Sequence, residues 1–230
     1  MNPAPRFDRL ARLYRWMELF SFGPWLMRCR VAFLGELCQR GASVSRALVL
    51  GDGDGRFTAQ LLAALPAVQV DAVDLSPAML AELKRHAGLN ADRVAAQVAD
   101  VRAFVPPSLP YALFVTHFLL DCLTTEEVRA LAAKLRASAA ADALWMVSEF
   151  ATPEGFYGRF VAWPMVRLLY LAFGLLTGLR TRTLPDHPAA LADAGFELAE
   201  RRAWLGGLLV SELWRVSDVK MRLTCHCRMG

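Results

Sequence analysis

The sequence predicts an α/β fold in which helices cover both faces of a doubly wound, parallel sheet. Between residues 47 and 150, short apolar runs alternate with amphipathic helical segments, which is typical of a parallel sheet. A loop with three alternate glycines follows the first apolar run, and acidic residues end the next two. Ligands of such sheets bind at the carboxyl ends of the strands, so we expect these features to form one site.

The composition indicates one domain with a large core. The chain has 230 residues, of which 55% are hydrophobic and 21% charged, with a formal net charge of +4. Its arginines are scattered, and no basic run with interleaved aromatics points to nucleic acid. The odd number and irregular spacing of the five cysteines favour reduced thiols in a cytoplasmic protein. The motif Cys225–His226–Cys227 lacks a second ligand pair, so no metal is expected and its role stays open.

We divide the predicted domain, residues 1–230, by these patterns. The divisions are an N-terminal helical lid at 1–42, a core at 43–150, an apolar cap insertion at 151–183, a helix and strands at 184–218, and a tail at 219–230. Helices are expected at about 7–22 and 25–37, separated by Gly23–Pro24. They either pack on the sheet or line a lid, to which Tyr14 would belong.

The core elements follow from periodicity and from start and stop signals. Ser76–Pro77 begins a helix and Gly88 ends it, while Thr124 and Glu127 form a capping box. Beyond the core, a helix is expected at 186–195. The predicted core helices span 57–65, 77–87 and about 125–139, and the predicted strands span 47–50, 69–73, 94–98, 111–116, 144–150, 196–202 and 208–216.

The insertion contains a segment, 156–179, that is rich in aromatic and aliphatic residues. It is long enough for a membrane span, yet Arg167, Pro164 and two glycines interrupt it. A buried or lid helix is the favoured interpretation, and a helix lying at a membrane surface is the alternative.

The glycine loop points to a cationic cofactor. A dinucleotide fingerprint would place glycine where Arg56 stands, and no Walker lysine follows. Asp52 and Asp54 within the loop would repel a pyrophosphate but tolerate a sulfonium and an ammonium group. The helix after the loop offers N–H groups to a carboxylate, and Asp74 can accept the hydroxyls of a ribose. Together these features favour S-adenosylmethionine.

Four segments carry a family resemblance: VLGDGDG at 49–55, VDAVDLSPAML at 70–80, QVADV at 97–101 and FDRLARLYRWME at 7–18. The first three resemble the class I S-adenosylmethionine-dependent methyltransferases, and the last is similar to the start of the ubiquinone/menaquinone C-methyltransferase group. The resemblance implies a Rossmann-like sheet of seven strands with the last antiparallel. The chain departs from the family pattern at Val49, a position where an acidic residue is common. Asp52 would then contact the ammonium group of the cofactor.

The resemblance also implies a set of cofactor contacts. The methionyl part would lie on the glycines, the ribose on Asp74, and the adenine near the ends of the second and third strands. The implied cofactor residues are Gly51, Asp52, Gly53, Gly55, Asp74, Leu75, Met79, Asp100 and Val101.

Methyl transfer depends largely on alignment in a dry pocket, and it needs a base only where the acceptor loses a proton. Candidate catalytic residues are His117, Asp121 and Glu149, with His117 best placed; Asp121 would alternatively orient His117 or cap the next helix. The apolar insertion and N-terminal helices predict a lipophilic acceptor: a phenol, quinone, polyketide, terpenoid or lipid-like molecule. Its predicted contacts are Tyr14, Phe118, Phe156, Tyr157 and Phe160.

Two other functions stay open. One is a non-catalytic or regulatory protein that binds S-adenosylmethionine, and the other is a peripheral membrane enzyme anchored by 156–179. The acceptor's identity, the atom that is methylated and the oligomeric state do not follow from the sequence.

Overall fold

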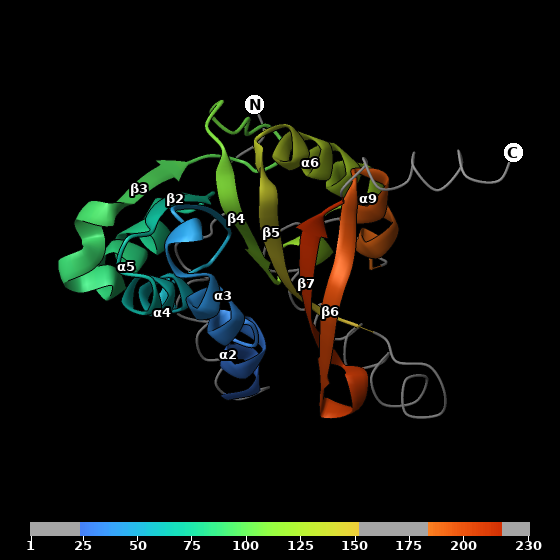
Figure 1. Ribbon diagram of the computed structural model, residues 1–230, viewed down its shortest axis with the longest axis horizontal. Helices are drawn as coiled ribbons and strands as arrows, with labels where there is room; N and C mark the ends of the chain where they lie inside the picture. Colours follow the sequence, from blue (N-terminus) through green and yellow to red (C-terminus); the bar gives the residue numbers. More distant parts are fainter. Residues whose placement is uncertain (1–23, 152–183, 218–230) are drawn as a thin grey trace, which may run out of the picture.

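The computed structural model describes residues 24–151 and 184–217, which form a single sheet with helices on both faces (Figure 1). The strand order is β3-β2-β1-β4-β5-β7-β6. β7 runs antiparallel to both of its neighbours, whereas the remaining pairs are parallel, which confirms the predicted mixed sheet. The strands are β1 Arg46–Leu50, β2 Gln69–Asp74, β3 Val94–Val98, β4 Tyr111–His117, β5 Ala139–Phe150, β6 Phe196–Trp204 and β7 Leu209–Val216.

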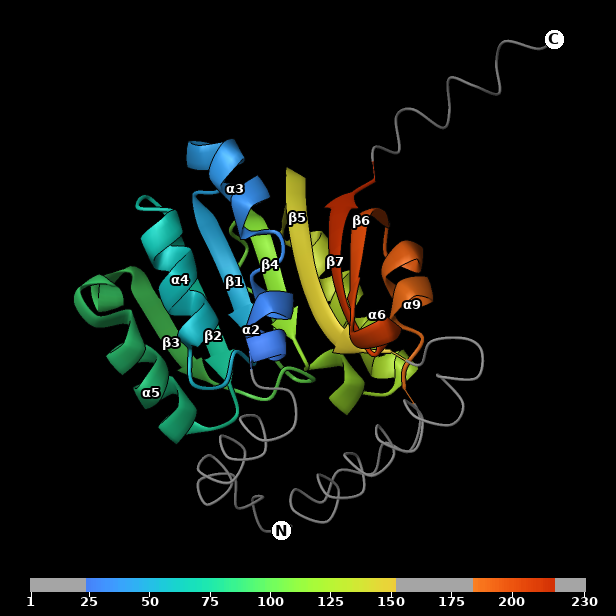
Figure 2. The same cartoon turned by 90° about the horizontal axis from the view of Figure 1, so that it is seen from below.

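The helices divide between the two faces. Helices α2 to α5 lie on one side of the sheet and α6 and α9 on the other (Figures 1 and 2). Their bounds are α2 Pro24–Arg30, α3 Leu34–Arg40, α4 Arg56–Ala64, α5 Pro77–Ala87, α6 Thr125–Ala137 and α9 His187–Asp193. Short 3-10 turns are η1 Gly41–Ser43, η2 Gly88–Arg93, η3 Leu120–Cys122 and η5 Leu205–Gly207.

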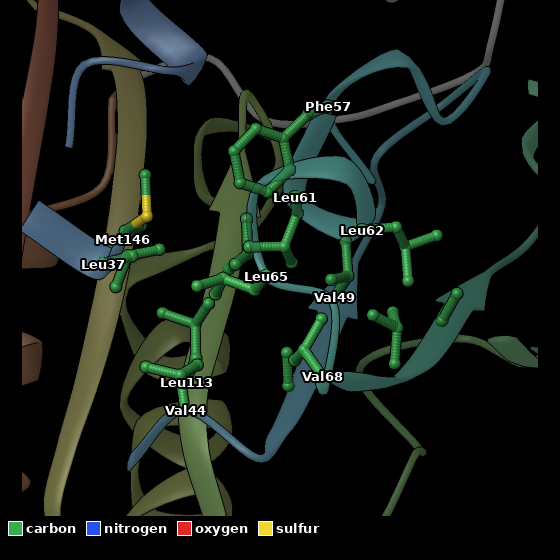
Figure 3. Packing of buried hydrophobic residues seen from close by; sticks show 14 of the residues in the cluster. Leu37, Val44, Val49, Phe57, Leu61, Leu62, Leu65, Val68, Leu113 and Met146 are labelled. Carbon is green, nitrogen blue, oxygen red and sulfur yellow. The ribbon is translucent and has the colours of Figure 1, made fainter. Parts of the chain in front are cut away.

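The alternation of side chains along β1 separates the two halves of the core. Val49 packs with Phe57 and Leu61 of α4 on one face, as Figure 3 shows. Leu48 and Leu50 point to the opposite face, where they join the cluster under α6 and α9. Both faces of this central strand are therefore buried, which is why its sequence reads as a continuous apolar run.

The predicted helix caps are confirmed. Ser76 Oγ accepts the backbone N–H of Met79 at 3.3 Å, and Gly88 follows the last residue of α5 with a φ of +57°. Thr124 and Glu127 cap each other's backbone N–H groups at the start of α6. These local signals place α5 and α6, two of the helices that connect parallel strands.

The prediction of a single helix at 25–37 is wrong, because the chain there forms α2 and α3 with a turn between them. The carbonyl of Cys29 accepts hydrogen bonds from the hydroxyls of Ser211 (2.7 Å) and Ser148 (3.3 Å) on the sheet. The carbonyl of Ala32 accepts the guanidinium of Arg202 from β6. Side chains of distant strands thus take carbonyls that a continuous helix would use.

The alanine-rich stretch after α6 also departs from its prediction. Residues 139–143 were expected to end a helix or form a loop, yet they begin β5. Ala139 pairs with Tyr111 of β4, so pairing in the sheet overrides the helical preference of alanine.

Several predicted features lie outside the described residues: the first helix, the apolar segment 156–179, the lining residues Tyr14, Phe156, Tyr157 and Phe160, and the Cys-His-Cys motif. Within 24–151 and 184–217, no helix is long and apolar enough to cross a membrane. In the same ranges, no group of three histidine, cysteine or acidic side chains is arranged to hold a metal ion.

Candidate functional site

The three glycines of the loop between β1 and α4 share one backbone conformation but differ in their surroundings. Gly51, Gly53 and Gly55 all have a positive φ, between +65° and +79°, which side chains rarely adopt. A Cβ atom on Gly55 would lie 2.5 Å from the Cα atom of Leu83, so this glycine lets α4 and α5 pack closely. A Cβ atom on Gly53 would meet nothing within 4 Å. Gly53 therefore leaves open space beside the backbone, where a ligand can approach.

Asp52 stabilises the start of α4. Its side chain is 4% exposed, and Oδ2 accepts the backbone N–H of Thr58 at 2.9 Å and the Thr58 hydroxyl at 2.6 Å. The prediction that the helix start is open to a ligand anion is therefore wrong for the Thr58 N–H, which already has a carboxylate partner. Burial raises the pKa of Asp52 to about 6, although the charge of Arg30 and the bonds from Thr58 oppose this rise.

Asp74 lies at the carboxyl end of β2, as predicted, and connects two loops. Its Oδ1 accepts the backbone N–H of Ser76 at 2.8 Å. Burial raises its pKa, against hydrogen bonds from the backbone of Ser76, Gly53 and Leu75. An ionised carboxylate has about four acceptor positions, so this side chain can accept these three backbone N–H groups and still accept one hydroxyl group.

The end of β3 completes this side of the site. Arg102 binds both carboxylate oxygens of Asp100, and these hydrogen bonds lower the pKa of Asp100. Val101 is buried beside it, whereas Leu75 keeps 38% of its surface exposed after β2. The partly exposed Leu75 offers an apolar surface directly after Asp74.

His117 ends β4 as a buried, neutral imidazole. Its side chain is 3% exposed, and its ring lies 4.5 Å from that of Phe57 in an edge-to-face arrangement. Burial, and then the charge of Arg30, lower its pKa well below the usual 6.5. Neither ring nitrogen has a hydrogen-bond partner among the described residues. The hypothesis that Asp121 orients His117 is therefore wrong.

Arg30 is a site residue that the sequence analysis missed. It belongs to α2, is buried, and places its guanidinium carbon 5.6 Å from the ring of Phe118. Its charge acts on both Asp52 and His117, so it lies near the carboxyl ends of β1 and β4, where Figure 2 shows α2. No local pattern marks this arginine, because its position depends on how α2 packs against the sheet.

Phe118 adopts a strained backbone conformation directly after β4. Its φ of +55° is unfavourable for a bulky residue and costs roughly 1–3 kcal/mol. Its ring packs 5.1 Å from that of Phe150 at the end of β5. This predicted acceptor contact is thus held at the carboxyl edge of the sheet by surrounding packing.

Glu149 and Asp121 are both buried, Glu149 one residue before the end of β5 and Asp121 within η3. Oε1 of Glu149 accepts the backbone N–H groups of Leu119 at 3.2 Å and Leu120 at 2.9 Å. Burial, and then the charge of Asp121, raise the pKa of Glu149 well above its usual value. Glu149 thus has clear backbone partners in the turn after β4.

His187 lies apart from these groups. Its Nε2 atom is 3.0 Å from Oε2 of Glu212, which also accepts the indole N–H of Trp214. The pair anchors α9 to β7, which supports a structural role for His187.

The chain is similar to a known protein family and to several solved structures. Residues 47–141 match the family model of the methyltransferase domain. The mitomycin 7-O-methyltransferase MmcR has 17% identity over 92% of this chain and 60% of its own, with a TM-score of 0.63. The S-adenosylmethionine-dependent methyltransferase SibL has 21% identity over 95% of this chain and 64% of its own, with a TM-score of 0.65. The N-methyltransferase NodS from Bradyrhizobium japonicum WM9 has 15% identity over 84% of this chain and 97% of its own, with a TM-score of 0.58.

The fold is that of the S-adenosylmethionine-dependent methyltransferases. The family model covers residues 47–141 only, and the likeness to these structures is a likeness of fold. The chain spans about two thirds or less of the length of MmcR and SibL. No curated protein sequence matches it.

Substitution of Gly55, which packs against Leu83, should cost more stability than substitution of Gly53, which faces open space. Gly55→Ala should lower the free energy of unfolding by roughly 2–4 kcal/mol, because its methyl group meets the backbone of Leu83. Gly53→Ala, the matched control, should cost only about 1–2 kcal/mol of backbone strain. Urea unfolding measures both, and equal losses would contradict the assigned packing.

The raised pKa of Asp52 predicts that Asp52→Asn makes the protein more stable than the wild type, by an amount that depends on pH. Because folding disfavours the charged carboxylate, the wild type loses stability as pH rises from 3.8 through about 6, and asparagine does not. The asparagine oxygen can still accept from Thr58. The difference in free energy of unfolding between the variant and the wild type should therefore rise in the variant's favour by about 2–3 kcal/mol from about pH 4 to pH 8. Urea unfolding across this range would reject the assignment if the difference between the proteins stayed constant.

Proposed function

We propose that this protein transfers the methyl group of S-adenosylmethionine to a lipophilic small molecule. The observation that carries the proposal is the connection between the open glycine loop and Asp74. Gly53 has free space on its Cα side, and its backbone N–H helps to hold the carboxylate that ends β2. A nucleoside cofactor can lie along this loop with its ribose on Asp74.

The remaining cofactor contacts follow from the same placement. The adenine would lie between Leu75 and Met79 on one side and Asp100 with Val101 on the other. The methionyl part would follow Gly51 and Gly53, and Gly55 would contribute mainly by allowing α4 to pack. Asp52 would supply negative charge near the ammonium group, since Val49 occupies the position where an acid is common in the family.

The residues around the reacting centre favour alignment over proton transfer. S-adenosylmethionine supplies a methyl group on a positively charged sulfur, whose charge is lost in the reaction. A buried apolar environment favours that loss, and Phe57 contributes buried apolar surface beside the ring of His117. With its lowered pKa, His117 is a weak base, so we assign it a neutral hydrogen bond to the acceptor. Asp121 stays a candidate for taking a proton.

A third apolar cluster supports a lipophilic acceptor. It joins α2 to the ends of β5 and β7, and Leu184 and Phe118 pack against it. Phe150 belongs to it and lies just before the insertion, while Leu184 lies just after it. Described residues on both sides of the insertion therefore contribute to one apolar cluster, and the predicted acceptor contacts Phe156, Tyr157 and Phe160 belong to that insertion in the sequence. We propose that the segment 156–179 and Tyr14 contact the acceptor and determine its specificity.

The finer resemblance to the ubiquinone/menaquinone group rests on residues 7–18, outside the described part, and makes a quinone a useful first acceptor. The alternative function is cofactor binding without turnover. Val49 favours it, because the usual acidic partner of the ammonium group is missing.

Asp74→Asn tests the cofactor site. The change replaces one carboxylate acceptor with an amide donor, so affinity for S-adenosylhomocysteine should fall about 10- to 100-fold by isothermal titration calorimetry. Asp92→Ala, an exposed residue of η2, is the control and should bind as the wild type does. Unchanged affinity of Asp74→Asn would remove the ribose assignment. A wild type that binds neither S-adenosylhomocysteine nor S-adenosylmethionine would reject the proposed function.

Turnover separates the two functions. Incubation with S-adenosylmethionine and a panel of phenols, quinones and polyketides should yield a methylated product by mass spectrometry. His117→Ala should slow this reaction by roughly tenfold or more without a matching loss of cofactor affinity. Tight cofactor binding with no product across the panel would favour the non-catalytic alternative.

A further inference from the structure

Glu149 takes over where the hydrogen-bond ladder between β4 and β5 stops. The backbone N–H of Phe118 donates to the carbonyl of Ser148 at 2.7 Å, as a strand residue would. The next two N–H groups, from Leu119 and Leu120, instead donate to Oε1 of Glu149. This side chain is 2% exposed. A side chain of β5 therefore replaces a backbone acceptor and holds the turn that leaves β4.

The turn held by Glu149 contacts the glycine loop through one side chain. A Cβ atom built on Gly51 would lie 2.9 Å from Cδ1 of Leu119, so the leucine rests against the Cα atom of Gly51. Gly51 has a φ of +66°, and its N–H donates to the carbonyl of Val73. A shift of Leu119 would therefore open or close space beside the first glycine of the loop.

We propose that Glu149 is a positioning residue for the cofactor loop, acting through the backbone and side chain of Leu119. It fixes the turn after β4, the turn fixes Leu119, and Leu119 supports Gly51. The inference rests on the proposed function, because it gives this loop the task of binding the cofactor. It differs from the base role predicted for Glu149 from the sequence, because it uses Oε1 alone, and the base role stays a prediction.

The character of the contact determines which substitutions are informative. The bonds need an acceptor oxygen at Oε1 and no negative charge, so Glu149→Gln keeps what the positioning role requires. Glu149→Met keeps the length and apolar volume of the side chain but removes the acceptor. Glu126, exposed in the first turn of α6, supplies a control acid near the same turn.

The first measurement is affinity for S-adenosylhomocysteine by isothermal titration calorimetry. Glu149→Gln should bind within about threefold of the wild type, Glu149→Met roughly tenfold or more weakly, and Glu126→Ala as the wild type does. Leu119→Ala should weaken binding as well. Because both residues act on one contact, the double variant Glu149→Met/Leu119→Ala should be little weaker than the worse single variant. Equal losses for Gln and Met, no loss for Met, or additive losses would overturn the proposal.

Hydrogen exchange of the ligand-free protein separates this inference from the proposed function. Glu149→Met should speed exchange of the N–H groups of Leu119, Leu120 and Gly51, and Glu149→Gln should restore their protection. Exchange in the middle of α6 should stay as in the wild type. If the wild type bound no cofactor, the proposed function would fail, while unchanged exchange at Gly51 in Glu149→Met would reject the positioning role by itself.

Discussion

The site depends on a backbone that turns three times through left-handed conformations between β1 and α4. Gly51, Gly53 and Gly55 make these turns possible, and two carboxylates hold them. Asp52 binds the first turn of α4 through Thr58, and Asp74 joins the loop to the end of β2. Since α4 and α5 pack through Gly55, the same loop also determines how two helices cover the sheet.

Buried polar groups gather beside this loop at a cost that the fold must offset. Asp52, His117 and Glu149 each keep at least one side-chain atom without a hydrogen-bond partner among the described residues. Such an atom costs about 1–3 kcal/mol when buried. Arg30 compensates part of this cost for Asp52 by placing a positive charge near it, but the same charge makes protonation of His117 less favourable. Arg30 thus favours the ionised form of Asp52 and the neutral form of His117.

Polar contacts and apolar packing together place α2 over this edge of the sheet. Hydroxyls of Ser148 and Ser211 bind the carbonyl of Cys29, while Leu26 packs with Phe150 and Leu209. The helix that carries Arg30 is therefore fixed by β5 and β7, which lie far along the chain. This connects Arg30 with the apolar cluster that contains Leu26, Phe150 and Leu209.

The sequence by itself determined the alternating α/β order, the caps at Ser76 and Thr124, and the glycine loop with Asp74, because these depend on neighbours within a few residues. It also predicted that acids from different strands meet at one edge, since parallel strands end together. Only the tertiary structure decided that the helix predicted at 25–37 breaks, that Arg30 reaches Asp52 and His117, and that Glu149 binds a turn. These features require contacts between residues about twenty to about a hundred and eighty positions apart, and no local pattern in the chain encodes such pairings.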